Sequence, residues 1–162
     1  MKDEAEKEKV HSNGVAYGKQ WLLLDPDVKG AVDKGKKFEE ALAEHAKIHE
    51  VPAIYWMTVN QGRAVENKSI ATRAANAPIL KQYMETVYKL GPGYYWGGVH
   101  RFFGVYFTKA PGQKDPGPDS KKQFERAVEI GPENLENRVL MAEYYATFVQ
   151  DRALYEKILK EV

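Results

Sequence analysis

With 162 residues the chain has the length of one domain, and 43% hydrophobic and 12% aromatic residues are enough for a packed core. Its 24 basic and 23 acidic residues leave a net charge of +1, which argues against the strongly basic surface that nucleic-acid binding requires. The sequence has no cysteine, so disulfides and thiolate metal sites are excluded.

The N-terminal segment is highly charged and contains no apolar h-region, so it does not have the pattern of a signal peptide. No stretch approaches the roughly 18 to 20 apolar residues that a membrane-spanning helix needs. We expect a single domain over residues 1–162, with residues 1–12 frayed. We also expect the chain to lack an export signal, and so to be a fragment or a shortened form of a longer protein.

Helical spacing of apolar residues runs through nearly the whole chain, and no segment alternates as a strand does, which predicts an all-α fold. The first helix is expected over about residues 4–24. Asp25 can cap the next helix and Pro26 suits its first turn, so a short helix is predicted to about Val32.

The segment KKFEEALAEHAKIHE, residues 36–50, predicts a third helix. In such a helix His45 and His49 would share one face, at a spacing that can chelate a metal. Two ligands are too few for a site, however, and the HExxH pattern is absent. We therefore predict that these histidines border the apolar side of the helix and that no metal is bound.

Two further helices are expected in the middle of the chain. The segment from Val51 is apolar on most faces as far as Asn60, and should be central. An unpaired amide there would be costly, so Asn60 should bond a neighbouring backbone group or line a polar spot in a cavity. Residues 77–90 form the next helix, with an apolar stripe made of Leu80, Tyr83, Met84, Val87 and Tyr88.

The second half repeats the helical pattern. A helix over residues 94–107 is followed by a Gly- and Pro-rich loop, residues 109–119. Ser120 and Gln123 have the spacing of a capping box for the following helix. Residues 134–150 are apolar nearly all round and should be buried, and Asp151 should cap the last helix.

An internal repeat links these helices. METVYKLGPG and FERAVEIGPE align at an offset of 40 residues (124 − 84), and the helices that follow align at 38 (141 − 103). The unit is a helix, a Gly-Pro turn and a helix, with a small residue, Gly104 or Ala142, where the partner helix must approach closely. This sequence pattern is a divergent form of that of tetratricopeptide repeats (TPRs). It predicts antiparallel hairpins stacked as a TPR-like superhelix.

The segment from Lys89 to Phe107 holds seven aromatic residues and five glycines. Within the helix, Gly97, Gly98 and Gly104 each cost about 1 kcal/mol, which close helix packing would offset. The rings exceed what one stripe can bury, so some should face a ligand cavity, a groove or a subunit interface. The rings predicted to line a ligand cavity are Tyr55, Trp56, Tyr95, Trp96, Tyr106 and Tyr144, with polar contacts from Asn60, His100 and Arg101.

Four segments together resemble the TRAP-transporter-associated T-component family, TatT: AIYWMTVNQGRA, GPGYYWGGVHRFFGVYF, FERAVEIGPE and LMAEYYATFVQDRALYEKIL. The resemblance runs from about Tyr17 to the C-terminus. It implies an all-helical, TPR-like, periplasmic lipoprotein family whose members partner the substrate-binding P-component of tripartite ATP-independent periplasmic (TRAP) transporters. It further implies an apolar tunnel for small hydrophobic or carboxylated solutes and a trimeric assembly. The lipobox cysteine and the N-terminal helices usual in such proteins are missing from this sequence.

Three functions remain open at this point. The first is a non-enzymatic transporter accessory protein that binds a solute and docks the P-component. The second is a generic TPR-like interaction scaffold without a small-molecule site. The third, a hydrolase or metal enzyme using His45, His49 or His100, has no supporting nucleophile, phosphate or dinucleotide motif. We predict the first, without a cofactor.

Overall fold

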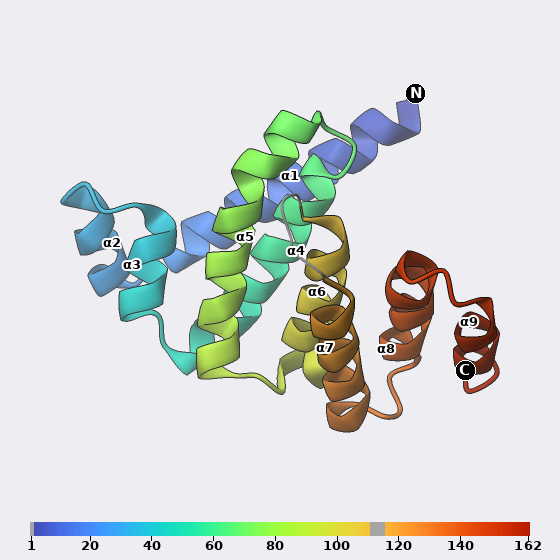
Figure 1. Cartoon of the computed structure of the whole chain (residues 1–162). Helices are drawn as coiled ribbons and strands as arrows, with labels where there is room; N and C mark the ends of the chain where they lie inside the picture. The colour runs from blue at the N-terminus through green and yellow to red at the C-terminus, as the bar shows by residue number, and fades with distance from the viewer. Residues whose placement is uncertain (1, 111–115) are drawn as a thin grey trace. The chain divides into compact units, whose positions relative to one another are not determined.

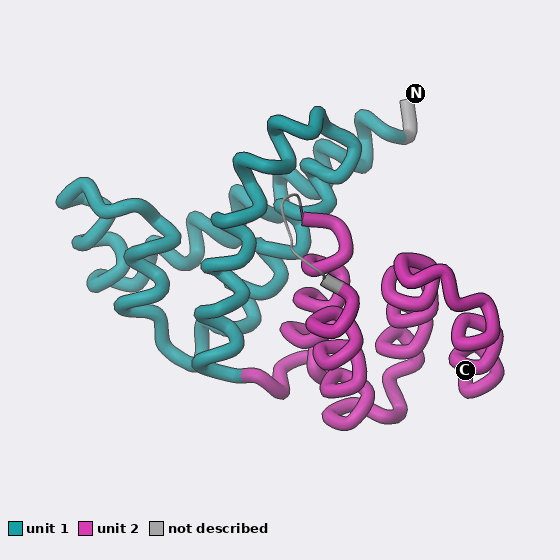
Figure 2. The backbone as a smooth tube through the Cα atoms, in the orientation of Figure 1, with its two compact units in different colours: residues 1–91 teal, residues 92–162 magenta. Residues whose placement is uncertain are grey.

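The computed structural model describes residues 2–110 and 116–162, and every regular element in these ranges is a helix (Figure 1). No β-strand occurs in the described ranges, so the all-α prediction is confirmed. The chain divides into two compact units, residues 1–91 and residues 92–162, coloured separately in Figure 2. The TPR-like stacking and the single domain stay predictions.

Unit 1 starts with α1 (Lys2–Leu22) and α2 (Pro26–Asp33), close to the two helices expected from the sequence. The predicted cap of α2 is confirmed. The carboxylate of Asp25 accepts hydrogen bonds from the backbone N–H groups of Asp27, at 2.8 Å, and Val28, at 3.2 Å. These bonds satisfy donors that the first helical turn leaves unpaired. The fraying expected of residues 1–12 stays a prediction.

The predicted third helix is too long. The helix α3 (Phe38–His45) ends where Ala46 turns to an extended conformation, and a 3₁₀ turn (Ile48–Glu50) follows before α4 (Val51–Val65). The buried carboxylate of Glu50 closes this turn by accepting a hydrogen bond from the backbone of Lys47 at 2.7 Å. His45 and His49 therefore lie on different elements, and the shared helix face predicted for them is wrong.

The helix α5 (Ile70–Leu90) begins seven residues before the expected start at Ala77, because Ser69 caps it through the backbone N–H of Thr72 at 3.1 Å. Its predicted apolar stripe is confirmed at four of five positions. Tyr88 is 47% exposed, so its inclusion in the stripe was wrong. The four positions that are buried are Leu80, Tyr83, Met84 and Val87.

Glycines allow α1 to approach α4 closely. A Cβ added at Gly14 would lie 2.7 Å from the Asn60 side chain, and one at Gly18 would lie 2.8 Å from Cβ of Met57. Both distances are shorter than carbon atoms in contact can tolerate. The two helices thus approach each other over the glycine side of α1, and Asn60 and Met57 fill the space.

Unit 2 contains α6 (Tyr94–Lys109), α7 (Pro116–Ile130), α8 (Leu135–Leu140), a π-helical segment (Met141–Ala146) and α9 (Arg152–Leu159). The cap predicted for the last helix is confirmed, since Asp151 accepts a hydrogen bond from the N–H of Leu154 at 2.9 Å. The predicted loop was too long, because α7 already begins at Pro116. Residues 111–115 of that loop lie outside the described residues. The core of unit 2 is built from Phe124, Met141, Ala142, Ala146 and Ile158.

The prediction that residues 134–150 are buried nearly all round is wrong. Leu135 is 47% and Phe148 is 45% exposed, whereas Asn137, Met141 and Ala142 are buried. The π-helical segment adds a residue to the turn, which rotates the apolar positions away from a single stripe.

Close packing of α6 on α7 explains Gly104. A Cβ at this position would lie 2.6 Å from the ring of Phe124, so the packing role predicted for Gly104 is confirmed. Ser120 lies inside α7, fully buried, and its hydroxyl donates to the backbone oxygen of Gly104 at 2.8 Å. The capping box predicted for Ser120 and Gln123 is therefore wrong, and Gln123 instead bonds Nδ1 of His100 at 2.8 Å.

The internal repeat is visible in the two Gly-Pro turns. The backbone N–H of Gly91 donates to the oxygen of Val87 at 2.8 Å, and that of Gly131 donates to the oxygen of Ala127 at 2.9 Å. Both bonds join equivalent residues of the two repeats. The shared geometry supports the helix-turn-helix unit inferred from the sequence.

Candidate functional site

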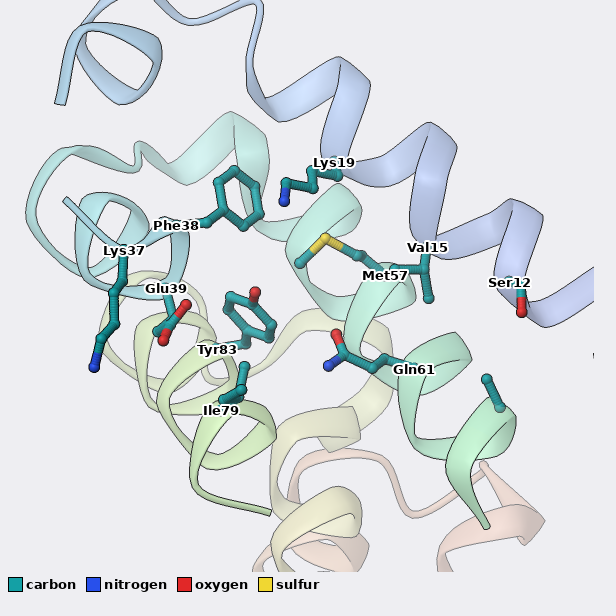
Figure 3. A pocket seen from close by; sticks show the side chains of 11 residues that line it. Ser12, Val15, Lys19, Lys37, Phe38, Glu39, Met57, Gln61, Ile79 and Tyr83 are labelled. Atoms are coloured by element: carbon teal, nitrogen blue, oxygen red, sulfur yellow. The ribbon is translucent and has the colours of Figure 1, made fainter. Parts of the chain in front are cut away.

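A cavity of about 580 Å³ opens between four segments of unit 1 (Figure 3). Its volume lies within the range of roughly 300 to 1,000 Å³ that is typical of small-molecule sites. The walls come from α1, from α3 and the residue that precedes it, from α4 and from α5. The lining residues are Ser12, Val15, Lys19, Lys37, Phe38, Glu39, Met57, Gln61, Ala64, Ile79 and Tyr83.

The floor of the cavity is aromatic and apolar. Phe38 and Tyr83 are both buried, and their rings meet edge to face with centroids 6.1 Å apart. Met57, on α4, is 2% exposed and lies opposite these rings in Figure 3. Because such a surface cannot hydrogen-bond water, it favours the apolar body of an organic ligand.

A lysine stands over this floor. Nζ of Lys19 lies 5.0 Å from the ring centroid of Phe38, the geometry of a cation–π contact. No carboxylate of the described residues forms an ion pair with Lys19. Its ammonium can therefore attract an anion that enters the cavity.

The hydroxyl of Tyr83 supplies a second donor. The residue is 5% exposed, and no hydrogen-bond partner for it exists within residues 2–110 and 116–162. Figure 3 shows the hydroxyl pointing toward the space bounded by Phe38, Met57 and Gln61. Burial raises the pKa of Tyr83 to about 12, and the charge of Glu39 adds to the effect. Tyr83 is consequently protonated at neutral pH and can donate to a ligand.

None of the nine residues predicted to bind a ligand lines this cavity. On α4, Tyr55 is buried, Trp56 is 40% exposed, and their rings contact edge to face. Asn60 donates to the backbone oxygen of Trp56 at 2.8 Å and lies 2.9 Å from Nδ1 of His11. The expectation that Asn60 bonds a neighbouring backbone group is thereby confirmed.

The cavity uses the adjacent face of α4. Met57, Gln61 and Ala64 recur at intervals of four and three residues, which places them on one side of a helix. This spacing is present in the sequence, but the ligand site was predicted on another face of the helix, from the aromatic rings of Tyr55 and Trp56. Lys19 and Glu39 carried no local signal, because only the tertiary fold brings their helices together.

The other six predicted residues belong to unit 2. Trp96 is 57% exposed, whereas His100 and Arg101 are buried. Tyr144 contacts Lys109, whose ammonium lies 4.6 Å from the ring centroid. Tyr95 and Tyr106 are half-buried. The convergence of these six residues with Tyr55, Trp56 and Asn60 on one ligand stays a prediction.

The first turn of α6 departs from the regular helix that was expected. Tyr95 (φ 51°, ψ 50°), Trp96 (φ 52°, ψ 51°) and Gly97 (φ 77°, ψ 25°) are left-handed. This conformation costs roughly 1–2 kcal/mol for each residue that has a side chain. Strain of this kind persists only where surrounding contacts over-determine it.

Asn137 supplies such contacts. Its side-chain nitrogen lies within hydrogen-bonding distance of the backbone oxygens of Trp96 (3.2 Å), Ala127 (2.8 Å) and Gly131 (2.9 Å). Its side-chain oxygen accepts a bond of 2.5 Å from Arg101. Asn137 could not be predicted as a site residue, because a single asparagine in a helical segment carries no distinguishing pattern.

Arg101 connects this residue to the surface of unit 2. Its guanidinium forms an ion pair of 3.1 Å with Glu136 and lies 5.5 Å from the ring centroid of Tyr95. The His100 side chain is likewise engaged, through Gln123. Burial lowers the pKa of His100, so its ring is neutral at physiological pH. Both residues thus have internal contacts, and their predicted ligand role remains a prediction.

The described residues contain no group of three or more histidine, aspartate or glutamate side chains arranged to hold a metal. Within the same residues, no helix has the length and apolar character needed to cross a bilayer.

A comparison with protein families places these features in context. The family model for the TRAP transporter T-component matches residues 5–162. No curated protein matches the chain. The family match begins well before Tyr17, where the resemblance of the sequence motifs was expected to start, and it covers both units. The chain therefore belongs to the TRAP transporter T-component family, a family of transport accessory proteins.

Proposed function

We propose that the protein is a non-enzymatic, periplasmic accessory component of a TRAP transporter. In this proposal it holds a small organic solute and docks the substrate-binding P-component of the transporter. One observation carries the proposal: a chain matched to the T-component over residues 5–162 contains a cavity of about 580 Å³, on whose wall an ammonium has no ion-pair partner and a phenol has no hydrogen-bond partner among the described residues. Homo-oligomer formation, such as a trimer, belongs to the same proposal.

The cavity of unit 1 suits a solute with an apolar body and an anionic head. Val15, Met57 and Ile79 offer apolar wall, while Lys19 and the hydroxyl of Tyr83 offer donors. A carboxylate that received both donors would form charge-assisted hydrogen bonds, which are stronger than neutral ones. We therefore assign the solute to this cavity.

Native mass spectrometry of the gently purified protein tests the assignment. The expected result is a bound organic molecule that Lys19→Met loses and Trp96→Ala retains. Loss from Trp96→Ala alone, with far-UV helicity intact, would instead assign the solute to the aromatic residues of unit 2 that the sequence suggested. Loss from neither variant would overturn both locations.

Docking is tested with the P-component encoded beside the gene. The two proteins should co-elute in size-exclusion chromatography, and a TRAP permease should be encoded next to them. If no P-component co-elutes and the gene has no TRAP neighbours, the transporter role fails. A generic interaction scaffold would then be the better description.

A further inference from the structure

We propose that the unit 1 cavity selects a zwitterion with an apolar body, of the amino-acid class, rather than a simple carboxylate. The inference rests on the proposed function, because it takes the same cavity as the solute site. It is carried by the charged residues of the cavity wall: Lys19 and Glu39 have no ion-pair partner among the described residues, whereas the third, Lys37, pairs with Glu40.

Lys19 is the anion-binding side. Its ammonium extends from α1 toward Phe38 in Figure 3, with Nζ 5.0 Å from the ring centroid. The hydroxyl of Tyr83 points into the same space from α5. A ligand carboxylate between these two donors would accept from both, and the phenol has no other hydrogen-bond partner among the described residues. The cavity therefore favours a ligand with one negative charge beside Lys19 and Tyr83.

Glu39 is the cation-binding side. It is half-buried in the first turn of α3, and its neighbours are engaged elsewhere: Lys37 lies 3.7 Å from Glu40, and Lys36 pairs with Glu44. Its charge is felt inside the cavity, since it contributes to the raised pKa of Tyr83. A simple carboxylate would leave Glu39 uncompensated and would be repelled by it. A ligand that also carries an ammonium would compensate the charge of Glu39 and offset its repulsion of the ligand carboxylate.

The apolar wall sets the third requirement. Val15, Met57 and Ile79 line the cavity from three different helices, so an apolar side chain is enclosed from several directions. A volume of about 580 Å³ leaves room for an aromatic ring beside the charged groups. A hydrophilic zwitterion would gain nothing from this wall. The class is thereby narrowed to amino acids with large apolar side chains.

Three probes that share a phenylethyl group separate the contributions of the two charges. L-phenylalanine carries both, hydrocinnamate lacks the ammonium, and phenethylamine lacks the carboxylate. Binding to the full chain is measured by isothermal titration calorimetry at neutral pH. L-phenylalanine should bind about tenfold tighter than either analogue, because each analogue loses one charge-assisted contact.

Two variants assign the contacts. Glu39→Gln should reduce affinity for L-phenylalanine to that for hydrocinnamate and leave hydrocinnamate unweakened. Lys19→Met should weaken L-phenylalanine and hydrocinnamate alike, without weakening phenethylamine. Glu6→Gln and Lys34→Met are matched controls, since they remove the same charges from residues of unit 1 that do not line the cavity. The ratio of L-phenylalanine to hydrocinnamate affinity should stay constant in both controls, and far-UV circular dichroism verifies folding.

The failures of the two proposals are distinguishable. If hydrocinnamate binds as tightly as L-phenylalanine and Glu39→Gln changes nothing, the zwitterion inference is overturned while the solute site stands. If none of the three probes binds to the folded protein, both the inference and the assignment of the solute to this cavity are overturned.

Discussion

Arg101 donates a hydrogen bond of 2.5 Å to the side-chain oxygen of Asn137, and both residues are buried in unit 2. Asn137 also contacts the backbone oxygen of Trp96, in the left-handed turn that opens α6. One amide thus joins the strained turn, the Gly-Pro turn at Gly131 and the buried guanidinium. Unit 2 is thus held together in part by a residue that no sequence pattern marks.

Replacing Asn137 by alanine should destabilise the protein by about 3–5 kcal/mol, since it removes several buried hydrogen bonds, one of them to a charged group. Equilibrium unfolding in urea provides the measurement. Asn134→Ala is the matched control. Among the described residues the Asn134 side chain bonds the N–H of Glu136, as the cap of α8, and its loss should cost about 1 kcal/mol. Equal losses in the two variants would show that Asn137 is not the hub described here.

Gly104→Ala should destabilise unit 2, because the new methyl group would lie 2.6 Å from the ring of Phe124. Overpacking of this kind costs about 1–3 kcal/mol, which exceeds the roughly 1 kcal/mol that alanine gains over glycine in a helix. Thermal or urea unfolding measures the difference. Gly62→Ala is the control, since among the described residues no atom beyond the neighbouring backbone of its own helix lies within 4 Å of the added carbon. The control should be stabilised; a stabilised Gly104→Ala would contradict the packing described for α6 and α7.

The helical fold could be predicted from the sequence because it rests on local patterns. Apolar spacing, the capping aspartates at positions 25 and 151 and the Gly-Pro turns act within one or two helical turns. One error occurred where a tertiary contact overrides such a pattern: Ser120 has the spacing of a cap but donates to Gly104 on a neighbouring helix. Another was local, since the helix α3 ends where Ala46 turns extended and a 3₁₀ turn closed by Glu50 follows.

The candidate site could be predicted less well, for a related reason. The high number of aromatic residues in one segment led to the prediction of rings such as Trp96. The number of rings does not indicate which face of a helix lines a cavity. The cavity in unit 1 is defined by four helices whose contributing residues are far apart in the sequence. Lys19 and Glu39 become notable only when the structure leaves both without an ion-pair partner among the described residues.

Tyr83 should make stability depend on alkaline pH. Its pKa is about 12 in the folded protein against a usual value of 10.0, so between these values the unfolded chain loses a proton that the folded protein keeps. Stability therefore falls as pH rises through this window, by about 2 kcal/mol for this residue. Urea unfolding across the window measures the loss in wild type and in Tyr83→Phe. The variant should lose less, and parallel curves would contradict the burial of the phenol.

Asp25 should matter at acidic pH. The ammonium of Lys47, 2.6 Å from its carboxylate, holds the pKa of Asp25 below its usual value of 3.8, and the backbone bonds of the cap add to this. The lowered pKa contributes stability above that value, and the contribution is lost as pH falls through the folded pKa. Asp25→Ala should cost about 1–2 kcal/mol at neutral pH through loss of the cap, and this difference from wild type should shrink in acid. A difference that is constant down to low pH would contradict the role of the carboxylate.

Gln150→Gly should stabilise the protein. Gln150 is exposed and follows the π-helical segment with φ of 57°, a left-handed conformation that glycine adopts without the steric cost of a Cβ. The gain should be about 1 kcal/mol, measured by urea unfolding. Gln20→Gly is the control, since Gln20 lies within the right-handed helix α1, where glycine should instead cost about 1 kcal/mol. The change in the free energy of unfolding should have opposite signs in the two variants, because the backbone is left-handed at one position and right-handed at the other. A destabilised Gln150→Gly would show that contacts of the glutamine side chain outweigh the backbone strain.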